Sequence, residues 1–251
     1  MVLAHPRQHS PNDRSVVITG ASSGLGRECA LHLDRLGFRV FAGVRRTEDA
    51  EALTAASPSG QLRPLMLDVT CEDSIRDAAA QVAHETCGTG LWGLVNNAGI
   101  CVSASLECVR SEQLRRQLET NLVGHFAMTR ALLPLSRKAK GRIINVSSGL
   151  GRITSPYLGA YASSQFAKEG LSDALRRELR PFGVAVVVSP RRSPTPSPRA
   201  GRRPATASAA TRGPPVCWRD CFRMPCWKRP SAPSSRRGTS LAVSLGSAEL
   251  D

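Results

Sequence analysis

The sequence predicts an α/β protein built on a doubly wound parallel sheet, with helices on both faces of the sheet. Between residues 14 and 189, short apolar runs rich in β-branched residues alternate with segments of helical periodicity. A glycine-rich turn follows the first of these runs, and near residue 190 the composition changes abruptly. We therefore expect a flexible N-terminal segment over 1–13, a folded domain over 14–189 and a low-complexity tail over 190–251.

The domain begins with residues 15–19 (SVVIT), whose β-branched side chains favour a strand. Apolar residues then recur at helical spacing from Leu25 to Leu36, and Gly37 is expected to end that helix. Further strands are expected at 38–44, 62–69, 91–95, 141–147 and 184–188, with helices at about 47–56, 71–86, from the fourth strand to about residue 140, and at about 157–179. This alternation predicts βαβ units with right-handed crossovers.

The composition indicates a globular domain and argues against a membrane-spanning one. Of the 251 residues 41% are hydrophobic, the mean hydropathy is −0.19 and no apolar run approaches the ~18 residues of a membrane span. Residues 1–14 lack the apolar core of a secretory signal, so we expect a cytoplasmic protein with free thiols. No metal site is expected, because Cys217, Cys221 and Cys226 have no histidine nearby.

The segment 190–251 has a composition of its own. It holds 12 of the 34 Lys and Arg residues but three acidic ones, a net charge of +9, and ten of the 17 prolines. Low hydrophobicity with high charge leaves too little apolar surface to offset an ordering entropy of ~1–2 kcal/mol per residue. We predict a fold truncated after its sixth strand and followed by a disordered basic tail, without a specific nucleic-acid partner.

The turn after the first strand is the first candidate binding site. It contains Gly20, Ser22, Ser23, Gly24 and Gly26. Glycines allow a backbone to approach a pyrophosphate closely, and the N-terminus of the following helix offers free N–H groups. The spacing departs from GxGxxG, and a tight turn without a ligand is the alternative interpretation.

Six short motifs give this turn a context. They are TGASSGLG (19–26), LDVT (67–70), NNAG (96–99), the helical Asn121, NVSS (145–148) and Tyr161 in YASSQ. Their order and spacing resemble the short-chain dehydrogenase/reductase family, in whose catalytic pair a Ser precedes the Tyr by thirteen residues, as Ser148 precedes Tyr161 here. The chain looks most like the branch of retinol, 17β-hydroxysteroid and 3-hydroxybutyrate dehydrogenases. The resemblance spans about residues 14–188 and implies a Rossmann-type dinucleotide-binding domain.

This resemblance implies an enzyme that moves a hydride between a nicotinamide and a carbonyl or secondary alcohol. Tyr161 is expected to be the general acid/base, Ser148 to hydrogen-bond the substrate oxygen and Asn121 to hold a water in the proton relay. Each residue taken singly also has a purely structural interpretation. Ser148 can cap a turn at a strand end, and Tyr161 can be a half-buried aromatic residue on a helix.

One position departs from the family pattern. The family has a Lys four residues after the Tyr, which binds the nicotinamide ribose and lowers the pKa of the phenol, whereas this chain has Gln165. A neutral amide can bind a ribose hydroxyl but adds no positive charge. If the loss of that charge raised the pKa of the Tyr161 phenol by ~2 units, a step that needs the phenolate would be about 100-fold slower. Lys168 either substitutes for the missing cation or is an ordinary solvated lysine.

The end of the second strand bears on the choice of cofactor. It continues into Arg45 and Arg46, with no acidic residue there. An acid at this point binds the ribose 2′-hydroxyl of NAD, whereas an arginine accommodates the 2′-phosphate of NADP. NADP(H) is therefore favoured over NAD(H), unless these arginines are simply exposed charges. By resemblance, Asp68 approaches the adenine, Asn96 lies on the adenosine ribose side and Gly99 belongs to the same site.

We therefore expect an NADP(H)-dependent oxidoreductase that interconverts a secondary alcohol and a ketone on a lipophilic, steroid- or retinoid-like substrate. Gln165 predicts impaired activity, as does the sequence after Ser189, which does not resemble the family's substrate-binding segment. The alternative is a non-catalytic dinucleotide-binding or interaction protein with a basic tail. A homodimer or homotetramer is compatible with the long helical stretches around 107–137 and 157–179.

Overall fold

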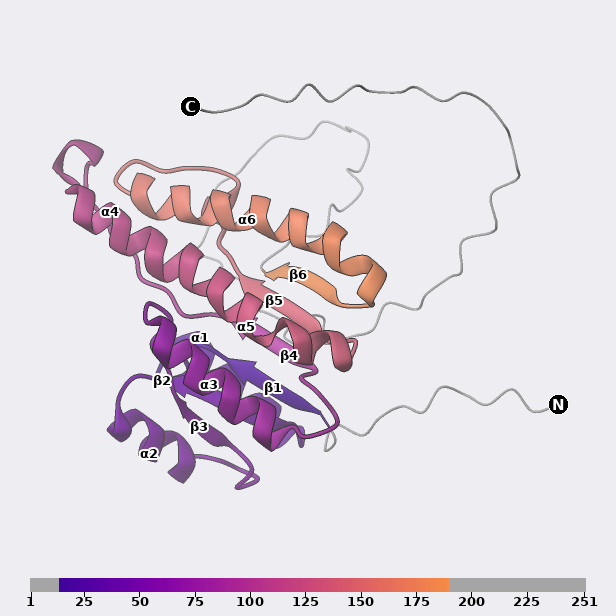
Figure 1. Cartoon of the computed structure of the whole chain (residues 1–251). Coiled ribbons are helices and arrows are strands. Elements are labelled where there is room, and N and C mark those ends of the chain that lie inside the picture. The colour runs from indigo at the N-terminus through magenta and orange to yellow at the C-terminus, as the bar shows by residue number, and fades with distance from the viewer. Residues whose placement is uncertain (1–13, 190–251) are drawn as a thin grey trace, which may run out of the picture.

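A computed structural model of the chain describes residues 14–189. The predictions for 1–13 and 190–251, among them the disordered tail, lie outside the described residues. The predicted parallel sheet is confirmed: six strands pair in the order β3-β2-β1-β4-β5-β6 (Figure 1). The strands are β1 (Ser15–Ile18), β2 (Arg39–Val44), β3 (Arg63–Met66), β4 (Gly93–Asn96), β5 (Arg142–Val146) and β6 (Ala185–Ser189).

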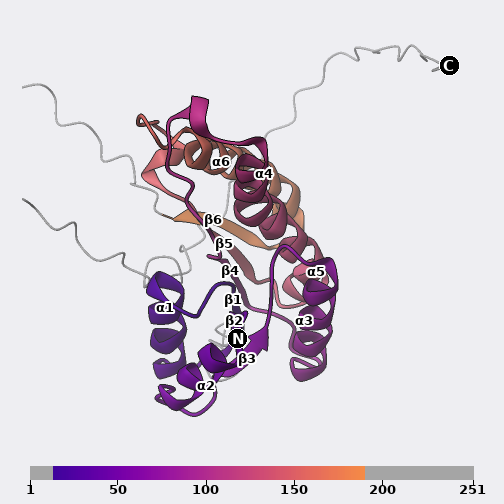
Figure 2. The same cartoon turned by 90° about the vertical axis from the view of Figure 1, so that its left-hand side faces the viewer.

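The helices alternate with the strands as the sequence predicts. They are α1 (Gly24–Arg35), α2 (Thr47–Ala55), α3 (Glu72–Glu85), α4 (Ser111–Leu118), α5 (Gly124–Lys138) and α6 (Gly159–Leu179). Short 3₁₀ turns are η2 (Leu106–Cys108), η4 (Gly149–Gly151) and η5 (Arg180–Phe182), whereas η3 (Glu119–Val123) is a π-helical turn. Figure 2 shows α1 and α2 on one face of the sheet and α3, α5 and α6 on the other.

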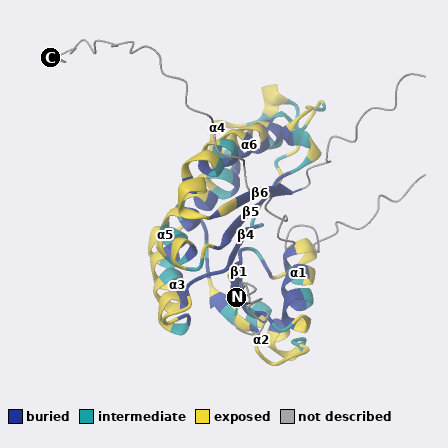
Figure 3. Ribbon diagram, turned by 90° about the vertical axis from the view of Figure 1, so that its right-hand side faces the viewer, coloured by how far each residue is buried: buried dark blue, intermediate teal, exposed yellow. Residues whose placement is uncertain are grey.

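Alternate residues of the central strand serve the two faces of the sheet. Val17 packs in one core with apolar residues of α3, α5 and α6. Val16 and Ile18 pack in a second core with apolar residues of α1 and α2. Figure 3 shows the buried residues concentrated along the sheet and on the helix sides that face it. Both faces are therefore covered, as a parallel sheet of hydrophobic strands requires.

The strand order reverses beside β1. Its two neighbours are β2, where Val16 lies opposite Val40, and β4, where Val16 lies opposite Gly93. The chain leaves β1 to one side and later returns to its other side, so the connections diverge at the carboxyl ends of the strands. This divergence opens a crevice just beyond Ile18, where such sheets bind their ligands.

Two predicted elements end differently in the structure. β3 ends at Met66 instead of residue 69, because Asp68 begins a turn in which its Oδ1 accepts the N–H of Thr70 at 2.9 Å. The helix predicted to reach residue 140 is divided by η3 between α4 and α5. At the start of α5 a Cβ on Gly124 would lie 2.5 Å from the carbonyl oxygen of Val69, so the helix approaches this loop closely.

Within residues 14–189, no helix combines the length and the apolar character that crossing a membrane requires. The same part of the chain contains no group of three or more His, Cys, Asp or Glu side chains placed to hold a metal ion. Five cysteines lie in these residues, and of these Cys29 is the buried one.

Candidate functional site

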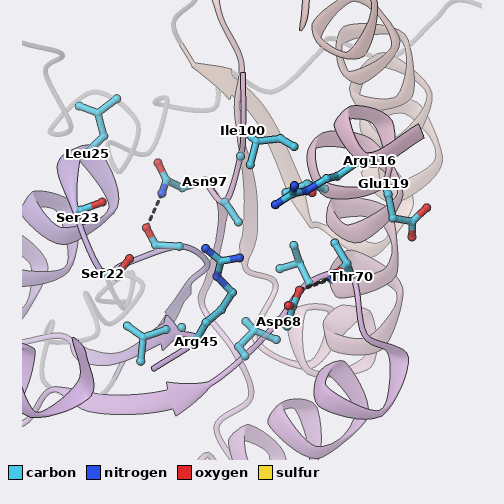
Figure 4. Close-up of a pocket in the computed structure, with 18 of the residues that line it drawn as sticks. Ser22, Ser23, Leu25, Arg45, Asp68, Thr70, Asn97, Ile100, Arg116 and Glu119 are labelled. Atoms are coloured by element: carbon cyan, nitrogen blue, oxygen red, sulfur yellow. Dashed lines mark hydrogen bonds between the residues drawn. The ribbon is translucent and has the colours of Figure 1, made fainter. Parts of the chain in front are cut away.

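A cavity of about 750 Å³ occupies the crevice at the carboxyl ends of β1 to β4 (Figure 4). The turn after β1 contributes Gly20, Ser22 and Ser23 to its wall. These are three of the five turn residues that the sequence singled out, whereas the other two, Gly24 and Gly26, are not among the lining residues.

The glycines of this turn are needed for close packing of the backbone. Gly20 has φ +67°, and a Cβ there would lie 2.8 Å from the Cα of Ala98. A Cβ on Gly26 would collide with the carbonyl oxygen of Gly20 and lie 2.5 Å from Nδ2 of Asn97. Gly24 also has a positive φ, +54°, but faces open space. Gly26 therefore lets α1 begin directly against the turn, which aims the free N–H groups of the helix into the crevice.

The side chain of Asn97 holds the turn in place. Its Nδ2 donates to the carbonyl oxygens of Thr19 and Gly20, each at 3.0 Å, and its backbone N–H donates to Oγ1 of Thr19 at 3.0 Å. Figure 4 shows Asn97 reaching across to the turn. Asn97 also lines the cavity. It thus fastens β4 to the first turn at the point where the strand order reverses.

The two arginines after β2 have different environments. Arg46 is committed to Asp49 through two contacts of 3.1 Å, from Nε to Oδ2 and from Nη2 to Oδ1. Arg45 lines the cavity. Asp49, one turn into α2, thus engages Arg46, which leaves Arg45 as the guanidinium of this pair that lines the cavity.

Asp68 is the acid of this cavity. Its Oδ1 accepts from the hydroxyl of Thr70 at 2.7 Å and from the Thr70 N–H at 2.9 Å. These hydrogen bonds, chiefly the one from the hydroxyl, and the positive charge of Arg45 lower the pKa of Asp68. An ionised carboxylate and a guanidinium therefore line the same cavity (Figure 4).

The far wall of the cavity comes from residues of α4 and η3 that no sequence motif marked. Arg115, Arg116, Glu119 and Thr120 line it, and Figure 4 shows Arg116 extending from its helix toward the cavity. Arg115 forms an ion pair with Glu112, in which Nη1 lies 3.7 Å from Oε1. The Arg-Arg pair was visible in the sequence, but no local pattern shows that α4 crosses the crevice.

A second cavity, of about 460 Å³, adjoins the first. Leu25 and the segment 97–100 line both of them, so the two spaces are continuous along the end of β4. Apolar side chains of Ile100, Leu150 and Leu158 form part of the second wall. Polar side chains also line it, among them Asn121, Tyr161, Gln165 and Lys168.

The structure brings Tyr161 and Asn121 together in this second cavity. Asn121 is 1% exposed and makes two hydrogen bonds to the backbone of Ile100. Its Oδ1 accepts the Ile100 N–H and its Nδ2 donates to the Ile100 carbonyl oxygen, both at 2.9 Å. A Cβ on Gly99 would lie 3.3 Å from this Oδ1, so Gly99 gives Asn121 room, and it lines both cavities. The π-helical turn η3 sets the inward position of Asn121.

Ser148 lies two residues after the end of β5. Its Oγ accepts the backbone N–H of Leu150 at 3.2 Å and so caps η4. This is the turn-capping geometry that the sequence left open as an alternative. Ser147, its neighbour, lines the cavity. Ser148 itself is among the lining residues of neither cavity, and its hydroxyl oxygen already accepts a weak hydrogen bond.

Asn96 takes a different part from the one the resemblance implies. It is fully buried and lines neither cavity, and its Nδ2 donates to Oγ1 of Thr129 at 3.0 Å and to Oδ1 of Asn145 at 2.9 Å. Asn97, the first residue after β4, lines both cavities instead.

Gln165 and Lys168 both line the second cavity from α6. Lys168 is 3% exposed, and its Nζ donates to the carbonyl oxygen of Val146 at 2.9 Å. Burial lowers the pKa of Lys168 to about 7, against the opposing charge of Glu169. The interpretation of Lys168 as an ordinary solvated lysine is therefore wrong. Gln165 is 2% exposed, and its Nε2 donates to Oγ of Ser164 at 3.3 Å.

His125 of α5 lies close to the same region and is 2% exposed. Its Nε2 is 2.6 Å from the carbonyl oxygen of Ala98. Burial, and secondly the charge of Lys168, lower the pKa of His125 well below its usual value. The imidazole is therefore neutral in the folded protein at neutral pH, and it donates from Nε2.

Comparison with protein families gives a match over residues 14–192 to the model described as short chain dehydrogenase. Among solved structures, a short-chain dehydrogenase from Streptomyces avermitilis is similar with a TM-score of 0.65 and 35% identity, covering 70% of this chain and 64% of that one.

Several characterised proteins are similar over the same region. A 3-amino-tetrahydro-pyrrolizinone reductase of Xenorhabdus hominickii is 47% identical over 175 residues, retinol dehydrogenase 7 of Mus musculus 44% over 176, and 17-beta-hydroxysteroid dehydrogenase type 6 of Homo sapiens 43% over 177. Each match covers 70% of this chain but 59%, 55% and 55% of the respective relative. The matched region thus spans little more than half the length of these relatives.

Proposed function

The chain belongs to the short-chain dehydrogenase family, and on that premise we propose that it is an NADP(H)-dependent oxidoreductase that interconverts a secondary alcohol and a ketone. One observation carries the proposal. Tyr161, the acid/base residue that the resemblance implies, lines a cavity that is continuous with the glycine-lined crevice at the strand-order reversal. A hydride carrier in the crevice and a proton donor beside it are what this reaction requires.

The first cavity fits the adenosine and pyrophosphate part of a dinucleotide. Gly20 lines this cavity, and its backbone packs so closely on Ala98 that no side chain fits there. Ser23 is the N-cap of α1 and makes no capping hydrogen bond with its side chain, which leaves the first N–H groups of the helix to an anion. Arg45 supports NADP(H) over NAD(H), because its guanidinium can pair with a 2′-phosphate.

The nicotinamide of a bound cofactor supplies or accepts the hydride. The protein's part in ketone reduction is to deliver a proton from the Tyr161 phenol to the carbonyl oxygen as the carbonyl carbon gains the hydride. Ser148 donates its O–H to the same oxygen while its own oxygen still accepts the Leu150 N–H. The Asn121 side chain is already committed to Ile100, which keeps the wall of the second cavity in place.

A lipophilic substrate suits the walls of the second cavity. Ile100, Leu150 and Leu158 line it, and Ile153 lies 67% exposed in the neighbouring loop. An apolar alcohol or ketone buries this surface on binding. The names of the relatives, a retinol dehydrogenase and a 17-beta-hydroxysteroid dehydrogenase, support a retinoid- or steroid-like compound.

Gln165 supports a slow enzyme, and it also favours the second candidate, a non-catalytic dinucleotide-binding protein. The amide carries no charge to stabilise the Tyr161 phenolate.

For assembly, we propose self-association through α5 and α6. Three apolar side chains on or beside these helices are 43%, 42% and 45% exposed, namely Val123 (directly before α5), Phe126 and Phe166. Such exposed apolar side chains on neighbouring helices are typical of subunit interfaces.

Titration calorimetry of the full chain with NADPH and NADH, followed by turnover assays, tests the proposal. We expect NADPH to bind and a panel of steroid and retinoid carbonyl compounds to contain at least one that consumes it. Binding without turnover of any compound favours the non-catalytic candidate. Failure to bind either dinucleotide overturns both.

A further inference from the structure

The edge of the sheet opposite the two cavities carries exposed basic side chains without acidic partners. The amino ends of the strands and the last turns of α1, α5 and α6 meet at this edge, and Figure 1 shows α6 ending at the right-hand side, where β6 begins. Six exposed cations lie in these last turns or directly after them, namely Arg35, Arg137, Lys138, Lys140, Arg177 and Arg180. Within residues 14–189 none of the six forms an ion pair, whereas Arg46, Arg76 and Arg152 elsewhere do.

Four of these cations gather where two loops lie side by side. The end of α5 and the loop after it carry three of them, and η5, directly after α6, begins with the fourth. The N–H of Ala185 donates to the carbonyl oxygen of Gly141 at 3.0 Å, and a Cβ on Gly183 would lie 3.5 Å from Cγ of Lys140, so the two loops are in contact. We call this part of the surface the basic corner, which consists of Arg137, Lys138, Lys140, Arg180 and Phe182.

Phe182 places an aromatic ring among these charges. It is 47% exposed, and Cζ of Arg137 lies 3.9 Å from the centre of the ring. Gly183, with φ +72°, reverses the chain directly after Phe182. In the described part of the chain, Phe182 belongs to neither apolar core. The ring therefore stays at the surface, on a tight turn between basic side chains.

Stabilisation of helix ends does not account for all of these charges. Cations favour the C-terminal end of a helix dipole, but the effect is confined to the last turn. Arg137 and Lys138 lie in the last turn of α5, whereas Lys140 lies two residues beyond it. The backbone of Lys140 has φ +47°, in the left-handed region where a glycine commonly ends a helix. A lysine thus occupies a position that glycine would fill with less strain, and it adds a charge to the corner.

The chemistry of the corner fits a lipid surface better than a nucleic acid. Proteins that bind single-stranded nucleic acid stack successive bases on several aromatic side chains. The corner has one ring, and Arg137 covers one face of it. A lipid surface requires only cations at the level of anionic headgroups and an apolar tip between them. Leu36, 43% exposed at the end of α1, adds a second apolar side chain at the same edge of the sheet.

We propose that the basic corner docks the protein on a membrane surface that contains anionic lipids, with Phe182 entering the headgroup layer. The four cations lie against the headgroups, and the ring of Phe182 occupies the boundary between headgroups and acyl chains. Both cavities lie at the opposite edge of the sheet and therefore face away from the membrane. The inference goes beyond the proposed oxidoreductase activity and does not depend on it.

Sedimentation of the full chain with lipid vesicles tests the proposal. The vesicles consist of phosphatidylcholine alone or of phosphatidylcholine mixed with phosphatidylserine. The double variant Lys140→Gln/Arg180→Gln removes two charges from the corner. Its matched control, Arg76→Gln/Arg110→Gln, removes two exposed charges from α3 and from the residue before α4, so that both variants have the same net charge. Every variant keeps residues 190–251, whose charge of +9 contributes equally to all measurements.

We expect the unaltered chain to bind the mixed vesicles and not those of phosphatidylcholine alone. Lys140→Gln/Arg180→Gln should bind the mixed vesicles about 25-fold more weakly, since each cation near such a surface contributes about fivefold. The control should stay within about twofold of the unaltered chain. Phe182→Ala should weaken binding about fivefold without changing its dependence on salt, because it removes apolar surface and no charge. Urea unfolding midpoints equal to that of the unaltered chain show that the variants are folded.

Three results overturn the inference. Equal binding of the mixed vesicles by Lys140→Gln/Arg180→Gln and by its control shows that net charge alone attracts the chain to lipid. Absence of binding by the unaltered chain shows that the corner is not a membrane surface. If the corner variant keeps its affinity for the vesicles but loses affinity for a uridine-rich RNA oligonucleotide, the corner serves a nucleic acid instead. None of these results bears on the proposed oxidoreductase activity.

Discussion

The buried Nζ of Lys168 lies 2.9 Å from the carbonyl oxygen of Val146, the last residue of β5, and donates a hydrogen bond to it. Burial lowers the pKa of this lysine to about 7 from 10.5, the value for an exposed lysine. Between these two pH values the unfolded chain carries a proton that the native protein has lost. The free energy of unfolding therefore rises as the pH increases from about 7 toward 10.5 and is lowest below that window.

This linkage makes the stability of Lys168→Met depend on pH relative to the unaltered chain. The variant avoids burying a charge, so its advantage in unfolding free energy should be greatest near pH 6 and should shrink by about 1–3 kcal/mol near pH 9. Urea unfolding at both pH values measures it. His125 and Glu169 are present in both proteins, and the exposed Lys138→Met serves as the control. An unfolding difference that is equal at the two pH values would show that Lys168 keeps an ordinary pKa.

Arg45 is expected to govern the preference between the two dinucleotides. Arg45→Gln should weaken NADPH binding about tenfold and leave NADH binding nearly unchanged, because the residue pairs with the 2′-phosphate alone. Arg45→Asp should reverse the preference. Arg46→Gln is the matched control, since Asp49 already engages Arg46. Calorimetric titration with both nucleotides gives the affinities, and equal binding of NADPH and NADH by the unaltered chain contradicts the assignment.

Tyr161 and Gln165 are expected to set the rate of the chemical step. Tyr161→Phe should abolish carbonyl reduction, whereas Gln165→Lys should raise it up to about 100-fold by adding a charge that favours the phenolate. The chain has two tyrosines, and Tyr157→Phe at the 66% exposed position is the control. Initial rates of NADPH consumption report the effect. Full activity in Tyr161→Phe would show that Tyr161 is not the acid. No gain in rate in Gln165→Lys would refute the role of a positive charge at this position.

Gly26 is expected to be intolerant of any side chain. A Cβ there meets the backbone of Gly20, which cannot move without displacing the turn, so Gly26→Ala should lower the free energy of unfolding by about 1–3 kcal/mol. It should weaken dinucleotide binding as well. Gly170→Ala in α6 is the control, because a Cβ there meets nothing within 4 Å and alanine favours a helix. Denaturant unfolding of both variants is the measurement, and a Gly26→Ala protein as stable as Gly170→Ala would disprove the close contact.

The strands and helices of residues 14–189 could be predicted from the sequence because their signals are local. Buried parallel strands are short apolar runs, and a helix repeats its apolar residues over a few positions. The glycine turn was predictable for the same reason, since Gly20 and Gly26 lie six residues apart within one strand-turn-helix unit. Motif order supplied Asn121 and Tyr161, which the structure places in one cavity.

Only the tertiary structure decided which neighbouring residues face that cavity. Asn96 and Asn97 are identical side chains in one motif, but Asn96 is the last residue of β4 and is buried, whereas Asn97 follows the strand and lines the site. Arg116 faces the first cavity because α4 crosses the crevice. Lys168 is 22 residues from the carbonyl that holds it, so its burial depends on how α6 packs on the end of β5. Helical spacing places a residue on a face of its helix, but the packing of that face determines whether the residue meets water, a core or a ligand.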